Sequence, residues 1–167
     1  MLKVMISIVK NYPDHQFVIA GAPGQEPDIY QPFISKENVA LLHNRTYDLL
    51  SLSYAALVTS GTATLETALF KVPQVVCYKG SRISYEIAKR VINLKYISLV
   101  NLILDREVVT ELIQNRFNKT ELKKELDHIL DDYQRAILFL DYYDLEKKLG
   151  GKGASKKVAK SIFEAIK

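Results

Sequence analysis

The chain has 167 residues, of which 48% are hydrophobic and 25% are charged, and its formal net charge is +4. This composition is typical of one globular domain and shows no low-complexity tract. No apolar run approaches the roughly 20 residues that a membrane-spanning helix needs, and the first residues lack the order of charged, apolar and small residues that marks a signal peptide. We therefore expect a soluble, cytoplasmic protein.

The single cysteine, Cys77, lies in the apolar run VPQVVCY and has no partner for a disulfide. A lone cysteine fits a reducing compartment, and we expect Cys77 to be a small buried hydrophobic residue. His15, His43 and His128 are far apart in sequence, and no zinc-type spacing of cysteine and histidine occurs. The sequence thus predicts no metal site.

The positive net charge favours anionic partners such as phosphates, nucleic acid or an acidic membrane face. The basic residues are dispersed, however, and alternate with acidic ones on predicted helices, as on solvated helix faces. Arg82 and Arg90 allow two interpretations, either contact with lipid phosphate or exposure on such a face. We expect no nucleic-acid partner.

The first part of the chain alternates between helical and extended patterns. Residues 2–12 have the apolar spacing of a helix, which Pro13 ends. We predict strands at 16–20, 39–42 and 55–59, a short helical or irregular piece at 26–33, and a helix at 45–54. That helix is expected to turn its leucines inward, namely Leu49, Leu50 and Leu52.

The pattern continues with a helix at 61–70, a strand at 74–78, a helix at 81–92 and an extended segment, at least in part, at 96–104. Beyond residue 105 we predict no further strand, only helices at 108–117 and 118–149 and an amphipathic helix after Gly150–Gly153. Asn118 with Glu121 resembles a capping box, and Ser155 is a candidate cap for the last helix.

Short, almost wholly apolar strands between helices are typical of a parallel sheet that helices cover on both faces. The sequence therefore predicts an α/β, doubly wound parallel sheet in a single domain, residues 1–167. The helical C-terminal region covers about residues 106–167.

The stretch AALVTSGTATLETALF places Ser60-Gly61-Thr62 where a buried strand turns into a helix. In a doubly wound sheet, ligands bind beyond the carboxyl ends of the strands. Free backbone N–H groups at a helix start attract phosphate, and glycine lets it approach closely. Glu66, one turn into the helix, could accept hydrogen bonds from a ribose. Alternatively, Ser60-Gly61 is only a tight turn and Glu66 only complements the helix dipole.

SGTATLE, followed by KVPQVVCYKGSRISYEIAKRVINLKYISLVNLILDREVVTELIQ, resembles the C-terminal domain of lipid-A-disaccharide synthases. These enzymes are glycosyltransferases with two Rossmann-like domains (GT-B type). YPDHQFVIAGAP before this stretch and GASKKVAKSIFEAI after it belong to the same resemblance, which therefore covers nearly the whole chain.

The resemblance implies that 2,3-diacylglucosamine is transferred from its UDP derivative to 2,3-diacylglucosamine 1-phosphate, which releases UDP and gives the lipid A disaccharide. It implies no metal and no other cofactor, and a peripheral location at the inner membrane surface. The catalytic residues are unknown from this chain, because the family's general base is expected in an N-terminal domain that the sequence lacks.

The resemblance assigns the binding of UDP to seven residues: Ser60, Gly61 and Thr62 at the diphosphate, Glu66 at the ribose, and Asn44, Arg45 and Thr46 near the uracil. It assigns the donor sugar to four further candidates: Asn101, Gln114, Tyr78 and Lys79. Other roles are open for three of these candidates. Asn101 could satisfy a turn, Gln114 could lie on a helix surface, and Tyr78 could belong to core or domain packing.

Family members are about twice as long and place a strand and a phosphate-binding loop before the first helix of this domain. We therefore expect a fragment with an exposed sheet edge that self-associates as a homo-oligomer. The alternatives are a non-catalytic nucleotide-binding or dimerisation module, or another UDP-sugar transferase or epimerase of the same fold.

Overall fold

A computed structural model describes residues 1–34, 38–81, 95–151 and 153–166. Within these ranges the strands are β1 (Phe17–Gly21), β2 (Val39–His43), β3 (Ala56–Thr59), β4 (Gln74–Tyr78) and β5 (Glu111–Ile113). The α-helices are α1 (Leu2–Ile6), α2 (Gln31–Ile34), α3 (Thr46–Leu52), α4 (Thr62–Leu69), α6 (Leu99–Leu104), α7 (Lys119–Leu130), α8 (Asp132–Leu149) and α9 (Ala154–Ala165). The same ranges contain the single-turn 3-10 helices η1 (Val9–Asn11), η2 (Pro27–Tyr30) and η3 (Gln114–Arg116).

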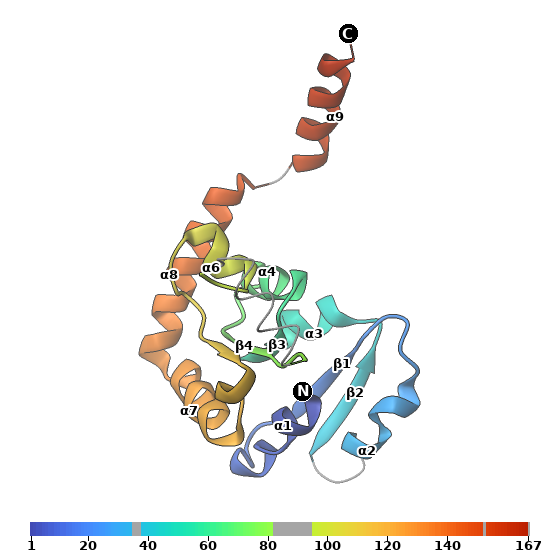
Figure 1. Cartoon of the computed structure of the whole chain (residues 1–167), viewed down its shortest axis with the longest axis vertical. Coiled ribbons are helices and arrows are strands. Elements are labelled where there is room, and N and C mark those ends of the chain that lie inside the picture. The colour runs from blue at the N-terminus through green and yellow to red at the C-terminus, as the bar shows by residue number, and fades with distance from the viewer. Residues whose placement is uncertain (35–37, 82–94, 152, 167) are drawn as a thin grey trace.

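The strands form two parallel sheets, one of β1 and β2 and one in the order β3-β4-β5. Strands β3 and β4 lie between helices α4 and α6 on one side and α1 and α7 on the other (Figure 1). Helix α3 packs on β1 and β2. The predicted α/β class, with parallel strands and a helical C-terminal region, is confirmed.

The main core gathers around β4, where Val75, Val76 and Cys77 are fully buried. Buried side chains of α4, α6, α7 and α8 and of the turn after α1 surround this strand: Ile8, Ala68, Val100, Leu122, Ile129, Leu138, Tyr142 and Leu145. Burial raises the pKa of the Cys77 thiol to about 12. Cys77 has no exposed surface, and the prediction that it is a small buried hydrophobic residue is confirmed.

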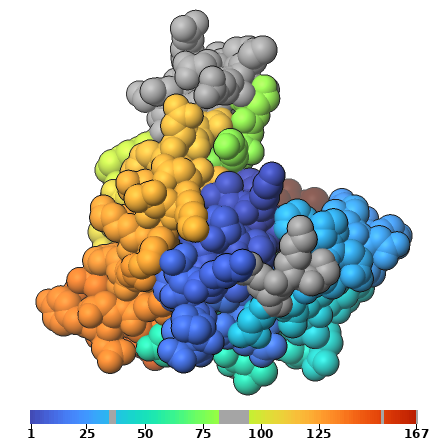
Figure 2. All heavy atoms as spheres, turned by 90° about the horizontal axis from the view of Figure 1, so that it is seen from below, coloured from blue at the N-terminus to red at the C-terminus, as the bar shows by residue number. Residues whose placement is uncertain are grey.

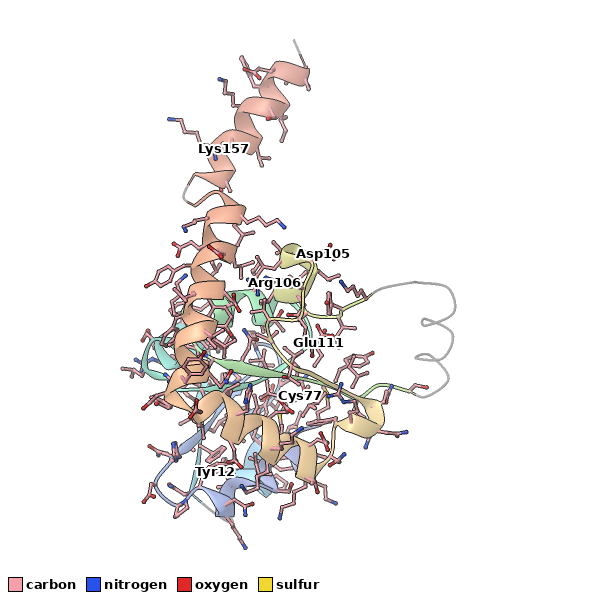
Figure 3. All side chains as sticks on the ribbon, turned by 90° about the vertical axis from the view of Figure 1, so that its left-hand side faces the viewer. Tyr12, Cys77, Asp105, Arg106, Glu111 and Lys157 are labelled. Carbon is pink, nitrogen blue, oxygen red and sulfur yellow. The ribbon has the colours of Figure 1, made fainter. Side chains whose placement is uncertain are left out.

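Polar contacts tie the C-terminal helices to this core. The Arg135 guanidinium stacks 3.4 Å from the Tyr54 ring centroid and donates to the Tyr54 carbonyl at 2.6 Å. Lys71 Nζ pairs with Glu146 at 2.7 Å. Helix α9 projects beyond this body (Figure 1), and Lys157 stands on it apart from the other labelled residues (Figure 3).

The N-terminal segment lies between α7 and the β1-β2 pair. In Figure 2 residues near the N-terminus, in deep blue, lie between the orange C-terminal helices and the light-blue β1-β2 region. The Tyr12 hydroxyl donates to Asp127 Oδ1 at 2.7 Å. The Tyr12 ring also lies 6.0 Å from that of Phe17, at the start of β1. Tyr12 therefore joins α7 to the first strand.

Several local predictions were wrong. The segment 96–104, predicted to be extended at least in part, is extended at Ser98 but forms helix α6 from Leu99 to Leu104, because Ser98 caps this helix and accepts a hydrogen bond from the Asn101 amide at 3.2 Å. Residues 108–117 contain strand β5 instead of a helix, because pairing with β4 outweighs their helical spacing. Thus a strand does follow residue 105.

Leu52 is 86% exposed and does not point inward, although Leu50 of the same helix is buried. Gly153 precedes α9 at the capping position, and Ser155 lies inside that helix. Asn118 caps α7 by accepting from the Glu121 amide at 3.1 Å. The predicted helix at 81–92, with Arg82 and Arg90, lies almost wholly outside the described residues.

Candidate functional site

The carboxyl ends of β3, β4 and β5 lie together at one edge of the three-stranded sheet. Thr59 is in register with Cys77, and Tyr78 with Ile113. The residues that follow these strands share this edge: Ser60, Lys79 and Gln114. Ligands of open α/β sheets bind at such an edge.

Helix α4 begins at this edge without a side-chain cap. Its N-cap is Gly61, whose φ of 147° suits glycine far better than other residues. A Cβ at Gly61 would meet nothing within 4 Å, so the helix start opens onto free space. Gly61, Thr62 and Ala63 are exposed. The uncapped amides of this turn are therefore available to an anion.

Hydrogen bonds of Ser60 and Thr64 hold the same turn against the start of α6. Ser60 Oγ donates to the Ile97 carbonyl at 2.9 Å, and its amide donates to the Cys77 carbonyl at 3.3 Å. The Leu99 amide donates to Thr64 Oγ1 at 3.3 Å. Because both donors of Ser60 are used inside the protein, Ser60 positions the turn, and the open amides belong to the residues after it.

Glu66 lies in the second turn of α4 and is half-buried. Within the described ranges its carboxylate has no ion-pair or hydrogen-bond partner. The pattern predicted Glu66 as a ribose acceptor, and that role stays a prediction. An unengaged carboxylate one turn from an open helix start has the chemistry the role needs, since it can accept both hydroxyl protons of a diol.

Tyr78 and Lys79 end β4 at the edge. Tyr78 is 37% exposed, and a Cβ at Gly80 would lie 2.8 Å from its hydroxyl. The phenol ring therefore folds back over Gly80, where only a residue without a side chain leaves room for it. Lys79 is exposed. Both side chains remain accessible to a ligand at the edge.

Gln114 follows β5 directly and combines two unusual features. Its φ is 52°, in the left-handed region that non-glycine residues rarely adopt. Its Nε2 amide is buried and has no hydrogen-bond partner among the described residues. Strained backbone and an unpaired buried donor both cost free energy, and such costs gather at functional sites. The predicted role of Gln114 at the donor sugar stays a prediction.

Asn101 belongs instead to a buried polar network beneath the edge. Its side-chain amide donates to the Val109 carbonyl at 2.8 Å and to Glu111 Oε1 at 2.9 Å, and its oxygen accepts from the amides of Val108 and Val109 at 2.8 and 3.0 Å. Asn101 is fully buried. All its hydrogen-bonding positions are used, so as placed it holds α6 against β5 and offers no polar atom to a sugar.

Glu111 completes this network from the first position of β5. Its carboxylate also accepts from the amides of Ile97 and Ser98, each at 2.9 Å. Figure 3 places Glu111 between Cys77 and the Asp105-Arg106 turn. Glu111 was not predicted from the sequence, because a single acid inside VVTELIQ resembles the polar face of a helix.

Asn44, Arg45 and Thr46, the predicted uracil loop, follow β2 in the other sheet. Asn44 has a φ of 57° and is exposed. Arg45 Nε donates to Asp48 Oδ2 at 2.7 Å. These residues therefore lie at the carboxyl edge of the β1-β2 pair and not on the edge that carries Ser60 and Gln114.

His43 is a second residue that sequence reasoning missed. It ends β2 and packs over Gly21, where an added Cβ would lie 2.8 Å from His43 Nδ1. Nδ1 is buried without a hydrogen-bond partner in the described part of the chain. The available signal was a histidine placed directly after the apolar run VALL.

Three other kinds of site were considered besides this sheet edge: a surface hollow, a metal site and a membrane-spanning helix. A hollow of about 570 Å³ lies away from it, lined by Lys3, Ile6, Ser7, Lys10, Pro32, Phe33 and Lys119. The described residues contain no group of three or more histidine, cysteine, aspartate or glutamate side chains arranged to hold a metal. Nor do they contain a helix long and apolar enough to cross a membrane.

Parallel strands alternating with helices, with a glycine-led helix at the carboxyl edge of the sheet, define the class of Rossmann-like α/β domains. Within that class, the chain belongs to the lipid-A-disaccharide synthetase family, whose sequence profile matches residues 1–165.

Curated relatives agree with this assignment. The chain is 32% identical over 171 residues to the lipid-A-disaccharide synthase of Anaeromyxobacter sp. (strain K), covering 100% of the chain and 45% of that protein. It is 36% identical over 172 residues to that of Syntrophus aciditrophicus, again covering 100% and 45%. With the Geobacter sulfurreducens synthase it shares 32% over 164 residues, 94% of the chain and 42% of the relative. The chain thus spans less than half the length of these relatives.

Proposed function

We propose that this domain binds the UDP-sugar donor of a lipid A disaccharide transferase. The whole enzyme transfers 2,3-diacylglucosamine from its UDP derivative to 2,3-diacylglucosamine 1-phosphate, and the remainder of the enzyme supplies the acceptor contacts and the general base. The observation that carries the proposal is that the open start of α4 at Gly61 and the buried amide of Gln114, which has no partner among the described residues, both lie at the carboxyl edge of the three-stranded sheet.

The chemistry follows from these groups. Departing UDP gains negative charge on its diphosphate, and oriented amides at a helix start stabilise that charge without reorganising. Gly61 and Thr62 supply these amides, and Glu66 accepts from the ribose hydroxyls. Gln114, with Tyr78 and Lys79, faces the donor sugar. Asn101 supports this edge from below through its contacts with β5.

Calorimetric titration tests the nucleotide part of the proposal. We expect UDP to bind at least about ten-fold more tightly than ADP, a difference of about 1.4 kcal/mol. Glu66→Ala should weaken UDP binding about ten-fold, because it loses the ribose hydrogen bonds. Glu107→Ala, which removes an exposed carboxylate elsewhere, is the matched control. Equal affinity for UDP and ADP, or an unchanged Glu66→Ala variant, would contradict the proposal.

Gln114→Ala separates a ligand contact from a structural role. Since Nε2 has no partner in the described protein, its loss should not lower the free energy of unfolding. It should weaken UDP-glucosamine binding more than UDP binding. Gln134→Ala on α8 serves as the control. A variant that unfolds more easily but binds both ligands normally would assign Gln114 to the fold.

The remaining expectations from the resemblance are also proposals. They are a homo-oligomeric state, a peripheral position at the cytoplasmic face of the inner membrane, and the GT-B architecture. Light scattering at low protein concentration tests the first, and a clean monomer would count against it. Co-sedimentation with anionic lipid vesicles tests the second.

A further inference from the structure

Residues 97–99 lie between the start of α4 and the start of β5 and bond to both. On the α4 side, Ser60 Oγ donates to the Ile97 carbonyl at 2.9 Å, and the Leu99 amide donates to Thr64 Oγ1 at 3.3 Å. In the sequence, these two bonds lie on either side of the glycine N-cap of α4. Segment 97–99 therefore holds the uncapped first turn of this helix from both of its ends.

Glu111 holds the same segment from the side of β5. Its Oε2 accepts from the Ile97 amide and its Oε1 from the Ser98 amide, each at 2.9 Å. Glu111 is only 8% exposed, and in the described part of the chain no cationic side chain pairs with its carboxylate. A buried carboxylate of this kind depends on the N–H groups around it. The bonds to Ile97 and Ser98 therefore fix Glu111 and segment 97–99 against each other.

Both oxygens of the Glu111 carboxylate are used in this arrangement. Oε1 already accepts from the Ser98 amide and from the Asn101 side-chain amide, each at 2.9 Å. Oε2 is the closer acceptor for the Ile97 amide, at 2.9 Å against 3.2 Å for Oε1. A glutamine has one acceptor oxygen and one NH₂ donor. With its oxygen in the place of Oε1, its NH₂ group would face the Ile97 amide, so the second carboxylate oxygen serves Ile97 in particular.

Ile97 connects Glu111 to Ser60 through the backbone of a single residue. Its N–H donates to the Glu111 carboxylate, and its carbonyl accepts from the Ser60 hydroxyl. A change at Glu111 therefore reaches the turn before α4 in two hydrogen bonds. Oriented amides stabilise an anion only where they point at it, and a misplacement of about 1 Å can cost roughly a hundred-fold.

We propose that Glu111 is a positioning residue for the nucleotide diphosphate: through Ile97 and Ser60 it holds the first turn of α4 in the orientation that binds the anion. The inference rests on the proposed binding of UDP. Glu111 acts through these contacts and not by touching the ligand, because N–H groups of the protein occupy both of its oxygens. Its loss should lower the affinity for UDP without removing any group that contacts UDP.

Calorimetric titration of Glu111→Gln with UDP tests the positioning role. We expect the affinity for UDP to fall about ten-fold, because the Ile97 amide loses its closer acceptor and the start of α4 shifts. Glu125→Gln is the matched control: Glu125 is also 8% exposed, lies on α7 and accepts from the Thr110 hydroxyl at 3.0 Å. It should bind UDP as the native chain does. An unchanged affinity in Glu111→Gln, or an equal fall in Glu125→Gln, would overturn the proposal.

Ser60→Ala breaks the same connection at its other end. We expect the affinity for UDP to fall about ten-fold here too, and the double variant with Glu111→Gln to bind UDP no more weakly than either single variant, because both changes act through Ile97. Losses that multiply to about a hundred-fold would overturn the proposal. So would native UDP affinity in Ser60→Ala, which keeps Glu111 in place and therefore tests the connection even where Glu111→Gln fails to fold.

Residue-resolved amide exchange tests the connection without nucleotide. The Ser60 and Leu99 amides donate to groups other than Glu111. In Glu111→Gln they should exchange at least about ten-fold faster, and in Glu125→Gln at native rates; native rates in both variants would overturn the proposal. Faster exchange with unchanged UDP affinity would overturn the positioning role alone. A native chain that binds no UDP would overturn the proposed function, and the exchange rates would still decide whether Glu111 holds the turn.

Discussion

The three-stranded sheet and the β1-β2 pair consist of similar strands in different surroundings. In β4 every residue from Gln74 to Cys77 is fully buried, whereas in β1 only Gly21 is buried. Strand β4 has a partner on each side and helices on both faces, but within the described ranges β1 pairs with β2 alone. The same kind of apolar sequence therefore gives a rigid core in one place and a half-covered edge in the other.

This contrast implies a gradient of local stability. Regions with many buried contacts open only with global unfolding, and edges with few contacts open locally. The polar network of Asn101 and Glu111 adds to the difference, because it lies wholly in the three-stranded half.

Asn101→Ala should lower the free energy of unfolding more than the other substitutions. It should remove most of the difference in local stability between the three-stranded sheet and the β1-β2 pair. It leaves the amides of Val108 and Val109 and the Glu111 carboxylate short of a partner, at a cost on the order of 3 kcal/mol. Urea unfolding gives the free energy. Asn115→Ala, at an exposed site, should change it by less than about 0.5 kcal/mol. A similarly small change for Asn101→Ala would mean that water replaces its bonds.

Val76→Ala and Val18→Ala compare the two sheets with one chemical change. Val76 has 0% exposure, so its truncation leaves a cavity and should cost about 2–3 kcal/mol. Val18 is half-buried, and its truncation should cost less than about 1 kcal/mol. Thermal and urea unfolding measure both. Equal costs would show that β1 is as tightly packed as β4.

Gly61→Ala tests the uncapped start of α4, next to the three-stranded sheet. A Cβ would meet no atom there, so the cost comes from the backbone φ of 147° alone, about 1 kcal/mol. UDP binding should weaken as well, because the first turn of α4 must shift. The exposed Ala63→Ser variant, which retains the helix start, is a suitable control. A lower free energy of unfolding with unchanged UDP binding would show that the turn at Gly61 does not contact the nucleotide.

Tyr12→Phe acts at the junction of the two halves and should have the smallest effect, about 1 kcal/mol or less. Burial opposes ionisation of Asp127, but hydrogen bonds from Lys123 and Tyr12 and the charge of Lys123 outweigh it, and the pKa of Asp127 lies below its usual value. Burial, followed by the bond to Asp127, raises the pKa of Tyr12.

The sign of the pH dependence follows from these directions. A lowered carboxyl pKa stabilises the fold above the unfolded value near 4, and this stability is lost as pH falls through the folded value. The raised tyrosine pKa contributes below the unfolded value of about 10. The difference between the native chain and Tyr12→Phe should therefore be constant from about pH 5 to 9 and shrink in acid. A difference that grows in acid would contradict this assignment.

Much of the fold could be predicted because its signals are local. Apolar runs bounded by Pro13, Gly21 or Ser60 mark β1 to β4, and Gly150 ends α8 with a left-handed φ of 78°. The SGT turn was found because glycine between a strand and a helix has a specific conformational use. Strand β5 and helix α6 were misread, because short apolar runs suit either structure until a neighbour is present.

The sequence alone determined the α/β class, the position of the turn at Gly61 and the family resemblance, since each depends on residue types close together in the chain. Only the tertiary structure decided that Asn101 is held by hydrogen bonds inside the core, that the Gln114 amide finds no partner among the described residues, and that β1 and β3 belong to separate sheets. These features depend on which distant segments meet, and the free energy of a buried polar group or a sheet edge is set by the partners found there.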